Sequence, residues 1–230
     1  EVGPGDPVVE IGPGLGSLTL ALVERGARVT AVEKDGELAA VLRSVVEPDG
    51  VTVVEGDALD LDWGPVLAGY DEWTLVANLP YNVATPLVLD LLRDVPAITS
   101  MLVMVQREAG ERLAAGAGDP AIGIPSLVVA YHARAEVVGR VPATVFHPRP
   151  RVESVLVRLV RHPAPPVSAP LDAIELLVRT AFGQRRKMLR RSLAGVVGPH
   201  EFAAAGVDPR ARPETLSLEA WSRLATAGRG

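Results

Sequence analysis

The first half of the chain alternates short runs rich in β-branched residues with longer amphipathic runs. Because a strand, a helix and a second parallel strand are joined by a right-handed crossover, this alternation predicts a parallel sheet covered by helices on both faces. In such a sheet, ligands bind at the carboxyl ends of the strands. The expected strands are residues 7–11, 28–32, 51–54, 75–77 and 101–105, and the expected helices are residues 15–25, 37–46 and 86–92.

The second half of the chain changes character twice. Residues 107–130 are expected to be helical with a Gly-rich break, and residues 135–141 and 152–160 are expected to be late strands at an antiparallel edge of the sheet. The following segment is rich in proline, and the chain beyond it has only helical periodicity. We therefore predict a doubly wound, Rossmann-like α/β domain over residues 1–162, a linker over 163–170 and a small all-α domain over 171–230.

Composition excludes several classes of protein. The chain is 48% hydrophobic and 22% charged, which is typical of a globular protein rather than a disordered one. No apolar run approaches the roughly 20 residues that span a bilayer, and no signal peptide is recognisable. The chain has no cysteine and its four histidines are scattered, so we expect no metal site and a cytoplasmic protein. We also expect a monomer, because no apolar surface stripe is left over.

The charge is distributed unevenly. The net charge is −5, but the stretch from Arg149 to Arg191 contains ten basic and three acidic residues. On a helical wheel drawn from Arg185, apolar side chains fall on one side and cations on the other, which predicts a docked helix with a basic outer face. A solvated face is the usual meaning of such a run. Here the clustering of cations without acids favours contact with phosphates.

A glycine-rich loop lies between the first expected strand and the first expected helix. Gly12, Gly14 and Gly16 let the backbone approach a ligand closely, and Glu33 ends the second strand, where a carboxylate can bind ribose hydroxyls. Nicotinamide and flavin enzymes have related loops. The G-x-G-x-G spacing and the extra acidic residue Glu10 favour S-adenosylmethionine, whose amino-acid part is cationic. Asp57 follows the third strand, where it can accept a hydrogen bond from an adenine amine.

The fourth expected strand is followed by Asn78-Leu79-Pro80-Tyr81. An exocyclic amine is a poor nucleophile because its lone pair is delocalised into the ring. The Asn78 side-chain oxygen and a main-chain carbonyl at Leu79 or Pro80 can accept the amine hydrogens and aim the lone pair at a methyl group. Pro80 stiffens this loop, and Tyr81 offers a ring on which the target base can stack. The sequence therefore predicts transfer of a methyl group to an exocyclic amine.

Together with these motifs, three later blocks resemble the bacterial small-subunit (16S) ribosomal RNA adenine N6,N6-dimethyltransferases over nearly all of the chain. The blocks are Phe146–Ser154, Ala181–Arg190 and Gly206–Pro209 with Arg212–Ser217. The resemblance implies S-adenosylmethionine as cofactor and two adjacent adenines near the 3′ end of the RNA as substrate, in an immature ribosomal subunit. It makes residues 1–162 a methyltransferase domain and 171–230 an RNA-binding domain.

The combined reading assigns a role to each candidate residue. The catalytic residues would be Asn78, Leu79, Pro80 and Tyr81. The cofactor contacts would be Glu10, Gly12, Gly14, Gly16, Glu33, Asp57, Ala58 and Asn78. The RNA contacts would be Tyr81, Phe146, Arg149, Arg151, Arg185, Arg186, Lys187 and Arg190.

The sequence departs from the family pattern at two places. The chain begins at Glu1, and the basic segment that precedes the first strand in the family, ending in a Gln-x-Phe-Leu-like motif, is absent, so we expect an N-terminally truncated chain. Pro125 stands in a stretch where the family pattern has no proline and is expected to change the start of a helix. A non-catalytic RNA-binding assembly factor of the same fold is the main alternative, followed by a methyltransferase for another RNA site or a protein amide, and then by a dehydrogenase.

Overall fold

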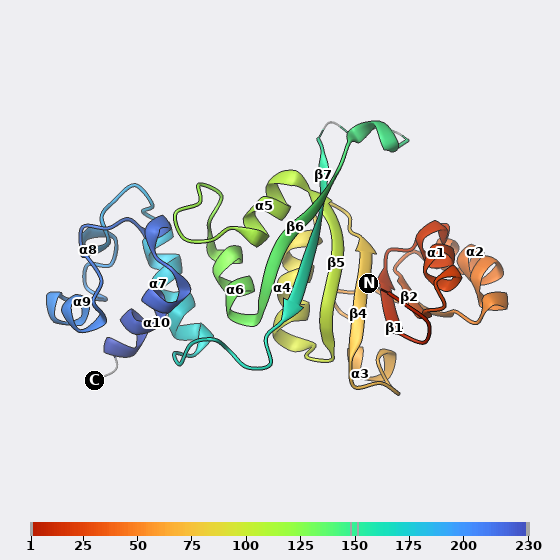
Figure 1. The fold of residues 1–230 in the computed structure, drawn as a ribbon, viewed down its shortest axis with the longest axis horizontal. Coiled ribbons are helices and arrows are strands. Elements are labelled where there is room, and N and C mark those ends of the chain that lie inside the picture. Colours follow the sequence, from red (N-terminus) through yellow and green to blue (C-terminus); the bar gives the residue numbers. More distant parts are fainter. Residues whose placement is uncertain (1, 148, 151, 229–230) are drawn as a thin grey trace. The chain divides into compact units, whose positions relative to one another are not determined.

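The computed structural model describes residues 2–147, 149–150 and 152–228, and the strands within these ranges form one seven-stranded sheet of order β3-β2-β1-β4-β5-β7-β6 (Figure 1). The strands are β1 (Pro7–Ile11), β2 (Arg28–Glu33), β3 (Thr52–Glu55), β4 (Trp73–Asn78), β5 (Ile98–Gln106), β6 (Ala133–Val141) and β7 (Ser154–Arg161). The neighbours from β3 to β5 are parallel, and β7 runs antiparallel to β5. The predicted parallel sheet with a late antiparallel edge is confirmed.

Helices follow most of the strands. They are α1 (Ser17–Glu24), α2 (Gly36–Val46), α3 (Trp63–Val66), α4 (Ala84–Asp94), α5 (Arg107–Ala114) and α6 (Ile124–His132), and later α7 (Leu171–Phe182), α8 (Leu189–Ser192), α9 (Pro199–Ala205) and α10 (Leu218–Ala227). Short 3-10 turns lie at Glu47–Asp49, Ala143–Val145 and Pro213–Thr215. None of the helices in the described ranges is long and apolar enough to cross a membrane.

The chain folds as two compact units. The first unit comprises Glu1–Gly110 and Glu136–Arg161, and the second unit comprises Glu111–Ala135 and His162–Gly230. Residues 111–135 thus associate with the C-terminal helices. The domain limits expected from the proline-rich segment remain a prediction.

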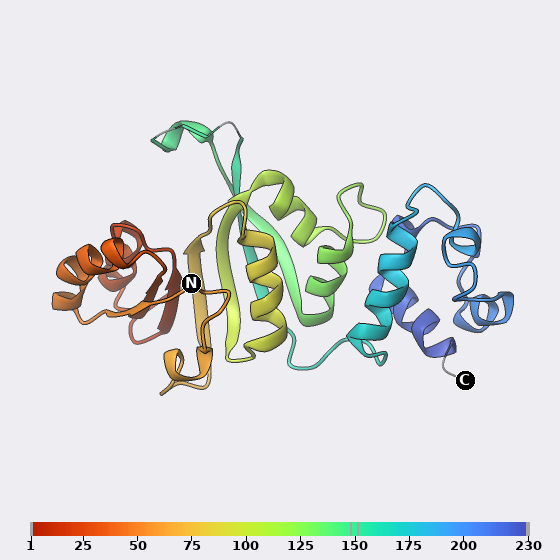
Figure 2. The ribbon, with the colours of Figure 1, turned by 180° about the vertical axis from the view of Figure 1, so that it is seen from behind.

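Helices cover both faces of the sheet in the first unit. Nearly every residue of β1 and β2 is buried, which requires apolar neighbours above and below the sheet because successive side chains point to opposite faces. Val8, Ala31 and Leu42 belong to one core cluster that joins these strands to α2. The helix α4 packs against the strand β5 of the sheet (Figure 2).

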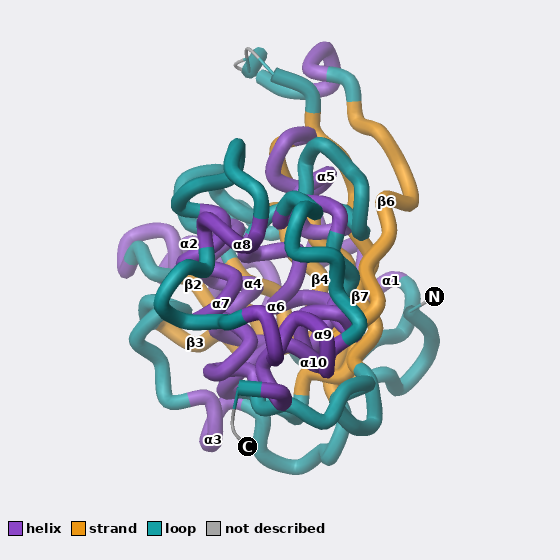
Figure 3. Tube along the Cα trace, turned by 90° about the vertical axis from the view of Figure 1, so that its left-hand side faces the viewer, coloured by secondary structure: helices purple, strands orange, loops and turns teal. Residues whose placement is uncertain are grey.

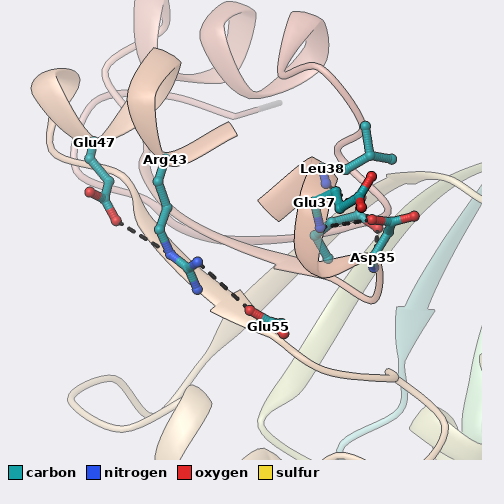
Figure 4. A network of polar contacts seen from close by, with 7 residues as sticks. Asp35, Glu37, Leu38, Arg43, Glu47 and Glu55 are labelled. Carbon is teal, nitrogen blue, oxygen red and sulfur yellow. Dashed lines mark hydrogen bonds and ion pairs between the residues drawn. The ribbon is translucent and has the colours of Figure 1, made fainter. Parts of the chain in front are cut away.

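Polar contacts fix both ends of the helix α2. Asp35 caps α2, since its Oδ1 accepts hydrogen bonds from the Glu37 and Leu38 amides at 2.9 and 3.1 Å. Arg43 of the same helix lies between Glu47 and Glu55 and links α2 to the end of β3 (Figure 4). These contacts hold α2 against the strand end that leads into the candidate site.

Arg161, the last residue of β7, binds main-chain carbonyls at the end of α4 and the start of β5. Its guanidinium donates hydrogen bonds to the carbonyls of Leu91, Leu92, Val95 and Ile98 at 2.7–3.1 Å. The last carbonyls of a helix have no partner within the helix, and a cation is favourable there. Arg161 therefore joins the end of α4 to the sheet. The strands β6 and β7 themselves run beside each other as a long ribbon (Figures 1 and 3).

The second unit has its own apolar core. Trp221 of α10, Ile174 of α7 and Phe202 of α9 are almost fully buried in one cluster, which also includes Leu127 of α6. Pro125 is accommodated at the second position of α6, where a helix amide needs no partner within the helix. The Gly123 amide donates to Ser126 Oγ at 3.0 Å and closes this first turn.

The helix predicted from Arg185 onward is wrong. The helix α7 ends at Phe182, turns follow, and α8 begins only at Leu189 after Met188 in an extended conformation. The Leu189 and Arg190 amides donate to the carbonyls of Ala211 and Pro209, both at 2.9 Å, so a neighbouring loop replaces the bonds of a continuous helix. The burial of Leu189 and Leu193 is as expected, and the side chains of Arg186, Lys187, Arg190 and Arg191 are exposed.

Candidate active site

The glycine-rich loop turns tightly between β1 and α1. Gly12 and Gly16 have φ angles of 70° and 87°, a region that side chains with a Cβ rarely adopt. A Cβ at Gly16 would also lie 3.0 Å from Leu42 Cδ1, so this glycine lets α1 approach α2 closely. At Gly12, by contrast, a Cβ would meet nothing within 4 Å. The loop is therefore packed on one side and open on the other.

Glu33 is buried beneath this loop at the end of β2. Its carboxylate accepts hydrogen bonds from the Gly14 amide at 3.2 Å and from the Asp35 amide at 3.0 Å. Two amide donors hold the carboxyl group in place although the residue is only 7% exposed. The glycine loop and Glu33 thus form one hydrogen-bonded structure.

A cavity of about 260 Å³ opens beside this structure at the carboxyl ends of β1, β2 and β3. Four predicted cofactor residues line it, namely Gly12, Glu33, Asp57 and Ala58. Pro80, predicted as a catalytic residue, also lines it. Its other walls, which sequence reasoning missed, are Ile11, Val32, Lys34, Gly56, Leu59, Asn82, Val83 and Leu87. For Lys34 and Gly56, the position directly after a strand end was the available signal, but neither Asn82 nor Lys34 belongs to a recognisable pattern.

Glu10 does not line this cavity. It is 1% exposed, and its Oε2 accepts a hydrogen bond of 2.6 Å from the Thr19 hydroxyl of α1. Burial raises the pKa of Glu10 to about 7, and the Thr19 hydrogen bond opposes this shift. The carboxyl group therefore links β1 to α1 across the glycine loop.

Asp57 lies on the cavity wall in an ion pair with Lys34. Lys34 Nζ is 2.6 Å from Asp57 Oδ2, and Asp57 Oδ1 accepts a hydrogen bond from the Leu59 amide at 3.1 Å. The hydrogen bond from Lys34 holds the pKa of Asp57 below its usual value, with a further contribution from the Leu59 amide. Both oxygens of the carboxylate thus have partners within the protein.

The tetrapeptide Asn78-Leu79-Pro80-Tyr81 connects β4 to α4. Asn78 is exposed at the strand end, whereas Leu79 is buried and its amide donates to the Met104 carbonyl of β5 at 3.2 Å. The Pro80 carbonyl accepts hydrogen bonds from the amides of Val83 and Ala84, both at 3.1 Å. The loop is thereby attached at one end to the sheet and at the other to the first turn of α4.

Tyr81 is held by a residue that is 73 positions away in the sequence. Its hydroxyl lies 3.0 Å from the Oγ of Ser154, the first residue of β7, which is fully buried. The sequence block Phe146–Ser154 indicated a family motif but gave no sign of this pairing. The geometry brings the cofactor cavity and the tetrapeptide together, because Pro80 lines that cavity.

The predicted RNA contacts fall in both units. In the first unit, Phe146 is half-buried and Arg149 is exposed, and Arg151 lies outside the described residues. In the second unit, Arg185 is engaged, since it donates to the Pro120 carbonyl at 2.9 Å and lies 3.8 Å from Glu214. Lys187 donates to Gln184 Oε1 at 2.8 Å. Among the described residues, no group of three or more His, Asp or Glu side chains could hold a metal ion.

Known proteins are similar to this chain over nearly its whole length. The family model described as ribosomal RNA adenine dimethylase matches residues 1–227. The protein named ribosomal RNA small subunit methyltransferase A in Acidothermus cellulolyticus is 45% identical over 99% of this chain and 81% of its own length. The protein of the same name in Leifsonia xyli is 48% identical over 96% of this chain and 82% of its own length.

Solved structures agree with the fold. The 23S rRNA methyltransferase ErmE superposes with a TM-score of 0.75 at 27% identity, covering 100% of this chain and 93% of its own. A dimethyladenosine transferase from Plasmodium falciparum superposes with a TM-score of 0.79 at 23% identity, covering 97% of this chain and 90% of its own. The second likeness concerns the fold alone. From the family model and these relatives, the chain belongs to the ribosomal RNA adenine dimethylase family.

Proposed function

We propose that the chain transfers methyl groups from S-adenosylmethionine to N6 of two adjacent adenines near the 3′ end of small-subunit ribosomal RNA. The observation that carries the proposal is the position of Asn78-Leu79-Pro80-Tyr81. This tetrapeptide leaves the sheet at the end of β4, and Pro80 lines the cavity beside the glycine loop. An amine held by the tetrapeptide would therefore face a methyl donor held in the cavity.

The residues of the cavity fit S-adenosylmethionine. Gly12 leaves open space where any other residue would place a Cβ, so a ligand can lie against the backbone. Glu33 is fixed by two amides at the cavity wall, where its oxygens can also accept from ribose hydroxyls. Asp57 and Ala58 follow β3 and would contact the adenine part. When bound, the cofactor supplies an electrophilic methyl group on a sulfonium.

Glu10, Gly14 and Gly16 would act on the cofactor through the shape of the loop. Gly16 permits close packing of α1, Gly14 donates its amide to Glu33, and Glu10 holds α1 through Thr19. A loop that is already ordered before the cofactor arrives costs less entropy on binding. We therefore assign these residues to positioning the loop rather than to direct contact.

The tetrapeptide would hold the adenine amine. The Pro80 carbonyl already accepts two amide hydrogens, so the Asn78 side-chain oxygen and the Leu79 carbonyl are the better acceptors for the two N6 hydrogens. Hydrogen bonds to both hydrogens favour a pyramidal nitrogen with its lone pair directed at the methyl group. Tyr81 would stack on the target base, and Phe146 would cover it from the loop before β7.

The substrate would be RNA within an immature small ribosomal subunit. Arg149 and Arg151 of the first unit and Arg186, Lys187 and Arg190 of the second would neutralise phosphates, while Arg185 would support this stretch through Pro120. The first unit would then be the methyltransferase domain and the C-terminal helices an RNA-binding domain. We further propose that the protein acts as a monomer in the cytoplasm.

The test is incubation of labelled S-adenosylmethionine with immature small subunits, followed by mapping of the modified bases. Label on two adjacent adenines supports the proposal, whereas subunit binding without transfer would identify an RNA-binding assembly factor instead. Asn78→Ala removes one acceptor of the amine and should abolish transfer while RNA binding stays nearly intact. Full activity of this variant would refute the proposed acceptor geometry.

A further inference from the structure

A second recess lies next to the candidate active site in the first unit. It has a volume of about 340 Å³ and is lined by Gln106, Arg107, Glu108, Val152 and Glu153. We propose that this recess binds the base of the adenine adjacent to the one being methylated. The inference rests on the proposed function and names a binding site for the second nucleotide of the substrate.

The recess directly adjoins the residues that hold Tyr81. Gln106 is the last residue of β5 and is paired with Ser154, the first residue of β7. Ser154 in turn lies 3.0 Å from the Tyr81 hydroxyl. One pair of residues in the sheet thus borders both the stacking ring and the recess. Two neighbouring bases of one RNA strand can therefore occupy the two positions together.

The charges of the recess favour a base over a phosphate. Glu108 and Glu153 contribute two carboxylates, and Arg107 is tied to Glu153 by an ion pair of 3.1 Å between Nη1 and Oε2. The Arg107 amide also donates to the Glu153 carbonyl at 3.0 Å, which fixes the two residues side by side. A phosphate entering here would meet both carboxylates, whereas the amine of a base can donate to them.

Gln106 supplies the feature that selects adenine. Its side chain is half-buried, and within the described ranges its amide group makes no hydrogen bond. A glutamine amide can bind adenine with two hydrogen bonds, accepting from N6 and donating to N7. Guanine presents acceptors at both corresponding positions, and pyrimidines lack N7. The recess would therefore distinguish an adenine neighbour from other bases.

The experiment compares small subunits reconstituted with natural RNA and with RNA in which guanine replaces one of the two adenines. With the unaltered protein, guanine at the neighbouring position should lower kcat/KM for the remaining adenine by about 5- to 150-fold, the range of a bidentate base contact. Gln106→Met should methylate the natural RNA more slowly and treat both RNAs alike. Gln106→Glu retains the acceptor and loses the donor. Its discrimination between the two RNAs should be weaker than that of the unaltered protein and stronger than that of Gln106→Met.

Two measurements keep the result specific. Gln184→Met serves as the matched control, because Gln184 lies in the second unit and accepts from Lys187, and it should discriminate as the unaltered protein does. S-adenosylmethionine affinity of Gln106→Met should be unchanged, which shows that the variant is folded. Discrimination that persists in Gln106→Met, or an unaltered protein indifferent to the neighbour, would overturn the inference while leaving the proposed function intact. Absence of transfer to any adenine would instead refute the proposed function.

Discussion

The Tyr81 hydroxyl lies 3.0 Å from Ser154 Oγ, so the loop after β4 is joined to the first residue of β7. Ser154 is fully buried and belongs to the antiparallel pair that β7 forms with β5. A buried hydroxyl is stable only with a hydrogen-bond partner, and each partner here satisfies the other. The orientation of the Tyr81 ring is thus set by the sheet rather than by its own loop.

This relationship separates two roles of Tyr81. Tyr81→Phe and Ser154→Ala each remove the hydrogen bond but keep the ring, and each should lower kcat/KM by about 2- to 12-fold, as expected for one net hydrogen bond. Tyr81→Ala also removes the ring and should cost a further ~5- to 150-fold through lost stacking. Steady-state kinetics with small subunits checks this order. Equal losses in Tyr81→Phe and Tyr81→Ala would argue against a stacking role.

The Lys34–Asp57 ion pair competes with the proposed adenine contact. Both oxygens of Asp57 already have partners, so an adenine amine must share one of them. Lys34→Met frees Oδ2 and lets the Asp57 pKa return toward its usual value, and we expect S-adenosylmethionine to bind a few-fold more tightly. Isothermal titration calorimetry measures the change, with Lys187→Met as control. Weaker binding by Lys34→Met would show that Lys34 itself contacts the cofactor.

Glu10 makes stability depend on pH in an unusual direction. Its pKa is raised to about 7 in the folded protein from an ordinary value of 4.5, so the folded state binds the proton more tightly than the unfolded state. Stability is therefore highest below pH 4.5 as far as this group is concerned, and falls as pH rises to about 7. The shift corresponds to roughly 3 kcal/mol of unfolding free energy.

Glu10→Gln removes this titration and retains a carbonyl oxygen that can accept from Thr19. Urea unfolding of both proteins between about pH 5 and pH 8 gives the comparison, because this range covers most of the interval between 4.5 and about 7. The unfolding free energy of the variant should rise relative to that of the unaltered protein up to about pH 7 and then level off. A constant difference across this range would contradict a shifted Glu10.

The exposed cations of the second unit should act on RNA and not on the cofactor. Arg186→Glu with Lys187→Glu should weaken small-subunit binding and make the plot of log affinity against log salt shallower by about 1.4–1.8, the slope for two phosphate contacts. Arg25→Glu, at the end of α1, is a control with the same kind of charge change. Filter binding at several salt concentrations measures the slopes. Loss of S-adenosylmethionine affinity in the double variant would refute the assignment.

The fold could be predicted from local features of the sequence. Periodicity of apolar residues located the strands and helices, and the right-handed crossover then fixed their parallel arrangement. The same logic placed the glycine loop, Glu33 and the tetrapeptide at the carboxyl edge of the sheet. The predicted helix from Arg185 failed because the wheel assumes a continuous helix, whereas the loop at Pro209 and Ala211 captures the amides of α8.

Side-chain partners required the tertiary structure. The sequence by itself determined which residues stand at strand ends, since that depends only on neighbours along the chain. It contained no sign that Tyr81 is hydrogen-bonded to Ser154, that Lys34 forms an ion pair with Asp57, or that Glu10 is buried and accepts a hydrogen bond from Thr19. Those pairings depend on strand order and register, which bring residues distant in sequence within hydrogen-bonding distance. The motifs therefore follow from the chain, and the contacts that position them follow from the fold.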